Sequence, residues 1–265
     1  LKEATIYVSL EPCSHFGKTP PCCDLIIANK IPNVVIGTVD PFAKVAGNGI
    51  KKLIESGKNV TIGILEDECN ELNKRFFTFH QKKRPYIILK WAETADGFIA
   101  PVSKEEKAPV WITNPYSRQL VHKWRTEEQA ILVGTTTVLA DNPKLDARDF
   151  SGNNPVRIVL DKSGKISENY YVKNNLQKTI FITENENHNS TENCIIENVI
   201  FDIDLISSIC NILYKNEIQS VIIEGGSLTL QSFINANLWD EARVFIGQTT
   251  FQNGTLAPTI SGNPV

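Results

Sequence analysis

The sequence predicts an α/β protein with two domains built on parallel sheets. Apolar, β-branched runs alternate with amphipathic stretches along the 265 residues, which is typical of parallel strands joined by crossover helices. A chain of this length holds one large domain or two ordinary ones. The basic, proline-ended segment 82–85 is the candidate boundary. We therefore expect a first domain over residues 1–82 and a second over residues 85–265.

Each expected element follows from its local pattern. In the first domain, strands are expected at 4–10, 33–39 and 60–65, and helices at 20–28, 49–56 and 66–79. The third helix is predicted as one piece because Leu72, Phe76 and Phe79 share a face and acidic residues fill its first turn.

In the second domain the same alternation continues. Strands are expected at 86–91, 130–134, 156–160, 179–183, 220–223 and 244–247, and helices at 116–125, 205–214 and 228–236. Asn114 and Pro115 suit the cap and first position of the first of these helices. Residues 184–198, rich in Glu and Asn, predict a solvated loop or hairpin, and no further strand is expected after residue 251.

Composition excludes several classes of protein. The chain is 42% hydrophobic with a net charge of -3, which excludes a disordered chain. It has no apolar run long enough for a membrane span and no basic stripe with interleaved aromatics, so neither a membrane nor a nucleic acid is expected as a partner. Six cysteines without a secretion signal favour a reducing cytoplasm. Residues 1–84 hold 12 basic and 9 acidic residues, which suits an anionic substrate or reflects a chance imbalance on solvated faces.

Three cysteines are crowded into one short stretch of the first domain. Cys13 follows the first strand, and Cys22 lies at a helix N-terminus, where the helix dipole favours a thiolate. Thiolates are zinc ligands. Cys23 points about 100° away from Cys22 and is expected to pack. There are two alternatives to a catalytic zinc site: all three cysteines are small residues of the core, or they belong to a structural zinc site.

The segment from Glu11 to Cys22 reads Glu-Pro-Cys-Ser-His-Phe-Gly-Lys-Thr-Pro-Pro-Cys. Together with Asp40-Pro41 and the segment 45–50, it resembles the bifunctional riboflavin-biosynthesis deaminase/reductase family. The resemblance implies an incomplete cytidine-deaminase-like zinc domain followed by a dihydrofolate-reductase-like domain. It implies Cys13 and Cys22 as Zn²⁺ ligands and places Lys18 and Asp40 near the substrate.

The sequence departs from the family pattern at one point. The family's third zinc ligand and its proton-shuttling Glu come from a His-Ala-Glu motif, and this sequence contains no His-x-Glu. We therefore expect that the chain begins downstream of that motif. Because residues 251–265 are rich in Gly, Pro, Thr and Asn, we also expect the C-terminal end to be incomplete. The 265 residues as written are expected not to deaminate.

Matches to the family continue through the second domain, including Lys90–Ala100, Ala130–Gly134 and Arg157–Asp161. The resemblance implies an NADPH site formed by Ala92, Trp111, Thr137, Asp141, Gly225 and Gly226, and substrate contacts from Arg125, Leu145, Arg148 and Glu224. From their residue types, Lys90 and Asp141 are the candidate catalytic residues.

The residue types suit these roles. Glycines before a helix let a phosphate approach free N–H groups, although a plain tight turn is the alternative. Arg125 and Arg148 are charged forks suited to a phosphate, or else surface ion pairs. Lys90 could polarise a carbonyl, or it could be a solvated strand-end lysine. Pro109 stands where the family usually carries a small polar substrate contact.

The implied function is riboflavin biosynthesis by two reactions. These are zinc-dependent deamination of a phosphoribosylated diaminopyrimidine and NADPH-dependent reduction of its ribose to ribityl. A homodimer through the reductase domain would suit the family. Two alternatives stay open: a reductase with a degenerate deaminase scaffold, and a non-catalytic nucleotide-binding module with a structural metal site.

Overall fold

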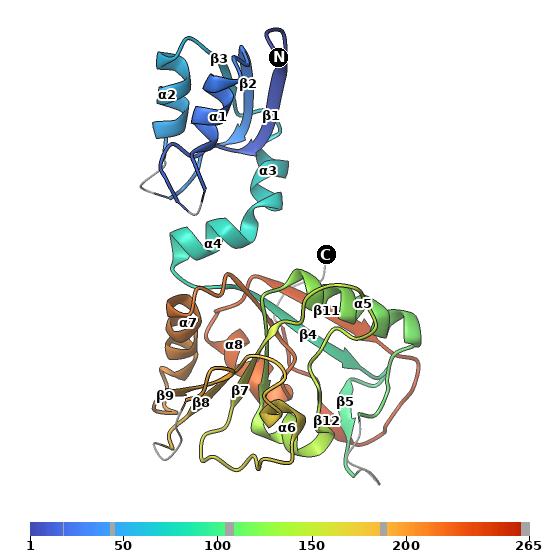
Figure 1. The fold of residues 1–265 in the computed structure, drawn as a ribbon. Coiled ribbons are helices and arrows are strands. Elements are labelled where there is room, and N and C mark those ends of the chain that lie inside the picture. The colour runs from blue at the N-terminus through green and yellow to red at the C-terminus, as the bar shows by residue number, and fades with distance from the viewer. Residues whose placement is uncertain (18, 43–45, 104–108, 186–189, 261–265) are drawn as a thin grey trace. The chain divides into compact units, whose positions relative to one another are not determined.

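The computed structural model describes residues 1–17, 19–42, 46–103, 109–185 and 190–260. The chain divides into two compact units, Leu1–Arg84 and Pro85–Val265; Figure 1 shows the elements of each.

The first unit is built on a three-stranded parallel sheet. Its order is β1 (Thr5–Leu10), β2 (Asn33–Thr38), β3 (Asn59–Ile62). The crossover helices α1 (Cys22–Ala28) and α2 (Asn48–Glu55) bury Ile26 and Leu53 with Val34 and Ile36 of β2.

The opposite face of this sheet is covered by α3 (Glu66–Leu72). Because strand side chains alternate, Gly37 faces away from Val34 and Ile36. A Cβ on Gly37 would lie 2.2 Å from the Cys69 Sγ atom of α3. This glycine therefore permits the close approach of α3 to β2.

The prediction of a single helix over residues 66–79 is wrong. The structure has two helices, α3 and α4 (Lys74–Lys82), which meet at Asn73. The Asn73 side chain donates a hydrogen bond of 2.8 Å to the Cys69 carbonyl oxygen. Such side-chain bonds to the backbone compete with helix continuation. An apolar face alone could not reveal this break.

The second unit contains a seven-stranded sheet in which every pair is parallel. Its order is β11-β4-β10-β6-β7-β8-β9. The strands are β4 (Tyr86–Glu93), β6 (Ala130–Gly134), β7 (Val156–Leu160), β8 (Thr179–Thr183), β9 (Cys194–Asn198), β10 (Ser220–Ile223) and β11 (Glu241–Ile246). A separate antiparallel pair joins β5 (Phe98–Pro101) and β12 (Gly254–Leu256).

Helices cover both faces of the large sheet, as Figure 1 shows. On one face, α7 (Leu205–Lys215) and α8 (Ser227–Asn235) pack on a cluster that includes Leu132. On the other, α5 (Pro115–Glu127) and α6 (Thr135–Asp141) pack on clusters that include Ile131 and Ile222. Burial on both faces explains why these strands are continuously apolar.

Several elements of the second unit differ from the sequence prediction, among them the strand β5, which was not predicted. Residues 184–198, predicted as a loop or hairpin, end in β9, which pairs with β8. The stretch after residue 251 contains β12, so a further strand does follow β11. The helix α6 was not predicted, and a short 3₁₀ helix spans Tyr171–Lys173. These elements are too short to show a clear hydrophobic periodicity, so the local sequence pattern does not predict them.

The predicted start of α5 is confirmed. The Asn114 side-chain oxygen accepts a hydrogen bond of 2.9 Å from the Ser117 N–H, and Pro115 is the first helical residue. In the described part of the chain, no helix is long and apolar enough to cross a membrane.

Candidate functional site

Three charged side chains lie where β10 ends beside β4 in the large sheet. Ile223 of β10 pairs with Leu89 of β4, so Lys90 and Glu224 are each the next residue along adjacent strands. Arg125, from the last turn of α5, donates from Nη2 to Glu224 Oε2 at 2.7 Å and from Nε to Oε1 at 3.4 Å. Parallel sheets bind ligands at the carboxyl ends of their strands.

Burial makes the charges of this cluster interdependent. Burial alone would raise the pKa of Glu224, but Arg125 and Lys90 outweigh it and lower that pKa to about 2. Burial lowers the pKa of the Lys90 ammonium, Glu224 opposes this shift, and Arg125 reinforces it. The Glu224 carboxylate is therefore ionised at neutral pH. Lys90 is held in a desolvated position beside this anion.

Lys90 is not fully paired by its neighbours. Among the described residues, its ammonium contacts the Phe245 ring, 5.8 Å from the centroid, and no hydrogen bond to it is found. Its donors are thus available to an incoming oxygen atom, which favours a role in the chemistry over that of a solvated strand-end lysine.

The loop after α6 brings a second arginine to this region. Arg125 Nη1 donates to the Asp146 carbonyl oxygen at 3.0 Å, and Arg148 Nη1 donates to Asp146 Oδ1 at 2.5 Å. Leu145 lies in the same loop with φ 55°, but its side chain is buried in the core. The backbone of Leu145, rather than its side chain, is therefore what a ligand could contact.

The glycines predicted for cofactor binding, Gly225 and Gly226, lie directly before α8. Gly134, which was not predicted as a site residue, precedes α6, and neither helix has a side-chain cap. Their strands, β10 and β6, are neighbours. A Cβ on Gly226 would lie 3.7 Å from Thr137 Oγ1, and one on Gly225 would lie 2.8 Å from the Thr229 Cβ.

This arrangement fits a phosphate-bearing dinucleotide. The first N–H groups of a helix have no partner within the helix, and side-chain-free glycines let a phosphate reach them. Thr137 and Asp141 lie one turn apart on the same side of α6. Ala92 lies two residues beyond Lys90 on β4. Trp111 is exposed, and the Arg118 guanidinium lies 4.3 Å from its ring centroid.

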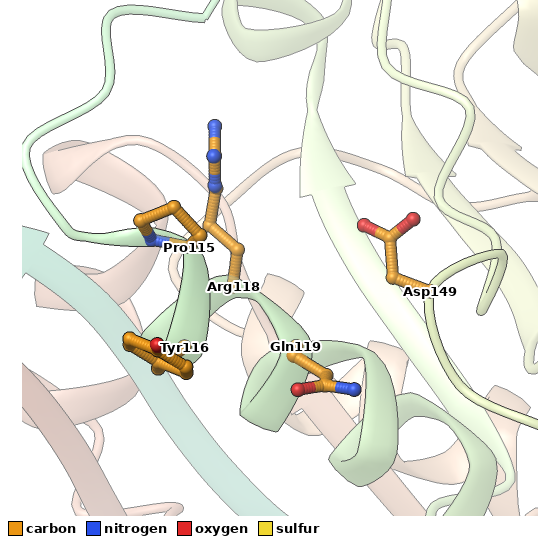
Figure 2. Close-up of a pocket in the computed structure, with 5 residues that line it drawn as sticks. All are labelled: Pro115, Tyr116, Arg118, Gln119 and Asp149. Carbon is orange, nitrogen blue, oxygen red and sulfur yellow. The ribbon is translucent and has the colours of Figure 1, made fainter.

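Residues of α5 and of the loop after α6 line an open pocket of about 300 Å³. It is lined by Pro115, Tyr116, Arg118, Gln119 and Asp149, and Figure 2 shows Asp149 on the side opposite the helix. None of these residues was predicted as a site residue. Asp149 directly follows Arg148 in the chain.

In the first unit, the two predicted zinc ligands lie together. The Cys22 N–H donates to Cys13 Sγ at 3.3 Å. Burial and the neighbouring Cys13 raise the pKa of the Cys22 thiol. Cys23 is fully buried, as predicted, and its thiol donates to the Pro12 carbonyl oxygen at 3.2 Å. Burial raises the pKa of Cys23 to about 11. Lys18 lies outside the described residues.

The residues described do not complete a zinc site. They contain no group of three or more His, Cys, Asp or Glu side chains placed to hold a metal ion. A catalytic zinc site takes three protein ligands. Two thiols therefore fit the metal only in part, and no chemical step can be derived through it.

Asp40 occupies a separate, buried position. Its Oδ1 accepts a hydrogen bond of 2.8 Å from the Phe42 N–H, and burial raises its pKa. It lines a pocket of about 440 Å³ with residues of α3 and α4, among them Glu66, Asn70 and Gln81.

Glu11 organises this region, a role that the sequence analysis missed. Its buried carboxylate accepts four backbone hydrogen bonds, from Asp40, Gly47, Gly49 and Ile50, at 2.8–3.3 Å. Gly49 approaches so closely that a Cβ there would lie 2.0 Å from the Pro12 carbonyl oxygen. The only signal in the sequence was an acidic residue directly after an apolar strand.

The fold and the charged cluster define a class of α/β protein with a charged site beside the end of a parallel strand. Residues 85–254 match the family described as the RibD C-terminal domain. The chain is 40% identical to the riboflavin biosynthesis protein RibD of Aquifex aeolicus (strain VF5) over 257 residues, which cover 96% of this chain and 71% of that protein. It is 34% identical to the RibD of Escherichia coli (strain K12), covering 92% and 70% of the two chains.

A solved structure is also similar. It is the diaminohydroxyphosphoribosylaminopyrimidine deaminase/5-amino-6-(5-phosphoribosylamino)uracil reductase of Thermotoga maritima, with a TM-score of 0.85 and 40% identity, covering 96% of this chain and 70% of that one. The chain belongs to the RibD family of riboflavin-biosynthesis enzymes, and its second unit contains the reductase domain of that family. The predicted family is confirmed.

Proposed function

We propose that the second unit uses NADPH to reduce the ribose of a phosphoribosylaminopyrimidine to ribityl. The observation that supports this most is the Lys90–Glu224–Arg125 cluster, whose Glu224 directly precedes the Gly225-Gly226 turn and the start of α8. Lys90, which can polarise a carbonyl, therefore lies near the Gly225-Gly226 turn, where a dinucleotide phosphate could bind.

Each residue has a role that its surroundings support. Gly225, Gly226, Thr137, Asp141, Ala92 and Trp111 would hold NADPH. When bound, NADPH supplies the hydride that reduces the opened ribose carbonyl. The Lys90 ammonium stabilises the negative charge that develops on the carbonyl oxygen. Asp141 orients the sugar hydroxyls or relays a proton.

The substrate would be held by charges of both signs. Glu224 accepts hydrogen bonds from sugar hydroxyls, and Arg125 and Arg148 bind the phosphate, with the Leu145 backbone beside them. Arg125 uses three of its five N–H groups in the protein. Two therefore remain for a phosphate oxygen.

For the first unit we propose a cytidine-deaminase-like domain with Cys13 and Cys22 as zinc ligands and with Lys18 and Asp40 near the deaminase substrate. Deamination would need a third ligand and a carboxylate acid/base, neither of which these 265 residues provide in a His-x-Glu motif. The alternative is a degenerate scaffold beside a working reductase.

A homodimer through the reductase unit is also proposed. The edge strand β11 exposes Val244 and Ile246, which a partner could cover. Size-exclusion chromatography with light scattering would give the mass, and a monomer at micromolar concentration would contradict this proposal.

The test of the reductase is NADPH oxidation with the deaminated phosphoribosylaminopyrimidine, followed by absorbance. We expect turnover by the chain as written, and loss of about 100-fold in Glu224→Gln, since hydrogen bonds to a buried charge stabilise the bound substrate. A folded chain that binds NADPH without turnover would instead support the nucleotide-binding module. Cys13→Ser is the matched control and should leave the rate unchanged.

A further inference from the structure

His122 is a buried residue of α5 to which no role has yet been given. It lies one turn before Arg125, and its side chain is 5% exposed. Its Nε2 lies 3.2 Å from Asp149 Oδ2, and its buried Nδ1 has no hydrogen-bond partner among the described residues. A buried, unsatisfied polar atom costs about 1–3 kcal/mol. An apolar residue would avoid this cost, so packing alone does not account for a histidine.

The His122–Asp149 contact fastens one end of a short loop to α5. The other end is fastened by the hydrogen bond from Arg125 to the Asp146 carbonyl oxygen. Arg148 lies between these two attachments and is itself paired with Asp146. The direction of the Arg148 side chain relative to Arg125 therefore depends on both contacts.

The charges around His122 favour its neutral form. Burial, Arg125 and Arg148 lower its pKa, and Asp149 and Asp146 oppose this shift. Among the described residues, Glu224 also interacts with His122 electrostatically. In the neutral form, with Nε2 protonated, His122 donates to the Asp149 carboxylate without adding a charge of its own.

We propose that His122 and Asp149 are positioning residues that hold Arg148 beside Arg125, so that the two guanidinium groups together bind the phosphate monoester of the substrate. This inference rests on the proposed assignment of the two arginines to the substrate phosphate. It goes beyond that assignment because neither His122 nor Asp149 need touch the substrate.

The first experiment removes the contact from its exposed side. Asp149→Ala should raise KM for the phosphorylated substrate about tenfold, with kcat within about twofold, because ground-state and transition-state binding of the phosphate weaken equally. The dephosphorylated substrate should show no change. Asp67→Ala, which removes an exposed aspartate of the first unit, is the matched control.

The second experiment tests whether the pair acts through Arg148. On an Arg148→Gln background, Asp149→Ala should raise KM less than about twofold, since coupled residues are not additive. His122→Leu should behave as Asp149→Ala does, and His122→Gln, whose amide can still donate, should restore most of the affinity. The proposal would be overturned if Asp149→Ala raised KM by the same factor on both backgrounds. It would also be overturned if the variant raised KM equally for the dephosphorylated substrate.

A third measurement separates this inference from the proposed function. Calorimetry with inorganic phosphate needs no turnover, and the Kd should rise about tenfold in Asp149→Ala. If the wild type does not oxidise NADPH but this shift in Kd is seen, the reductase proposal fails and the positioning pair stands. An unchanged Kd would refute the pair whatever the turnover.

Discussion

The two units place their candidate sites by similar topology but complete them to different degrees. In both, polar groups gather near the end of a parallel strand: Glu11, Cys13 and Cys22 lie beyond β1, and Glu224 directly follows β10 beside Lys90 of β4. In the first unit, the buried carboxylate of Glu11 accepts its hydrogen bonds from backbone N–H groups. In the second unit, the largely buried carboxylate of Glu224 lies beside the side chains of Arg125 and Lys90. The comparison teaches that a carboxylate's partners, rather than its burial, decide whether it serves the fold or a ligand.

The largest expected effect is on stability, at the ion pair of the second unit. Arg125→Met should lower the free energy of unfolding by about 3–5 kcal/mol, because Glu224 would remain buried without its main partner. Urea unfolding followed by circular dichroism measures the change. The double variant Arg125→Met/Glu224→Gln should recover most of the loss. A single variant as stable as the wild type would show that the pair is weakly coupled.

The second effect is on turnover. Lys90→Met should reduce kcat for NADPH oxidation about 100-fold, the range found when one group that stabilises a developing oxyanion is removed. Phe98→Leu, a change on β5, is the control and should keep the rate within about threefold. A Lys90→Met variant with wild-type kcat would remove Lys90 from the chemistry and leave it as a structural cation beside Glu224.

The third effect should be confined to the first unit. Glu11→Ala leaves four backbone N–H groups without their acceptor, at a cost of about 2–3 kcal/mol after water enters. Hydrogen exchange should then accelerate at Asp40, Gly47 and Gly49. The amides of β4, β6 and β10 should exchange as before. Acceleration in both units would mean that they unfold as one.

The smallest effect is a shift in a pH profile. The Lys90 ammonium must stay protonated to polarise a carbonyl, so reductase activity should fall as the pH rises through its lowered pKa. Glu224 raises that pKa, and Glu224→Gln should therefore move the falling limb of log kcat to lower pH. A limb that stays in place in the variant would show that another group titrates.

Much of the fold could be predicted from local pattern. The strands from β1 to β11 that have long apolar runs were found, as were the starts of α1 and α5, because Pro20-Pro21 and Asn114-Pro115 are direct signals. The break at Asn73, the helix α6 and the strands β5, β9 and β12 were missed. The break depends on one side-chain hydrogen bond, and the strands depend on pairing with other strands distant in sequence.

The sequence by itself determined the family and the chemical types of the site residues, because the Glu11–Cys22 segment and the Glu224-Gly225-Gly226 turn are specific strings. Only the tertiary structure decided how those residues are used. It paired Arg125 with Glu224, gave Glu11 to the backbone, turned the Leu145 side chain into the core and placed His122 against Asp149. The physical reason is that charge, burial and hydrogen-bond partners belong to neighbours in space, and these neighbours lie up to 99 residues apart along the chain.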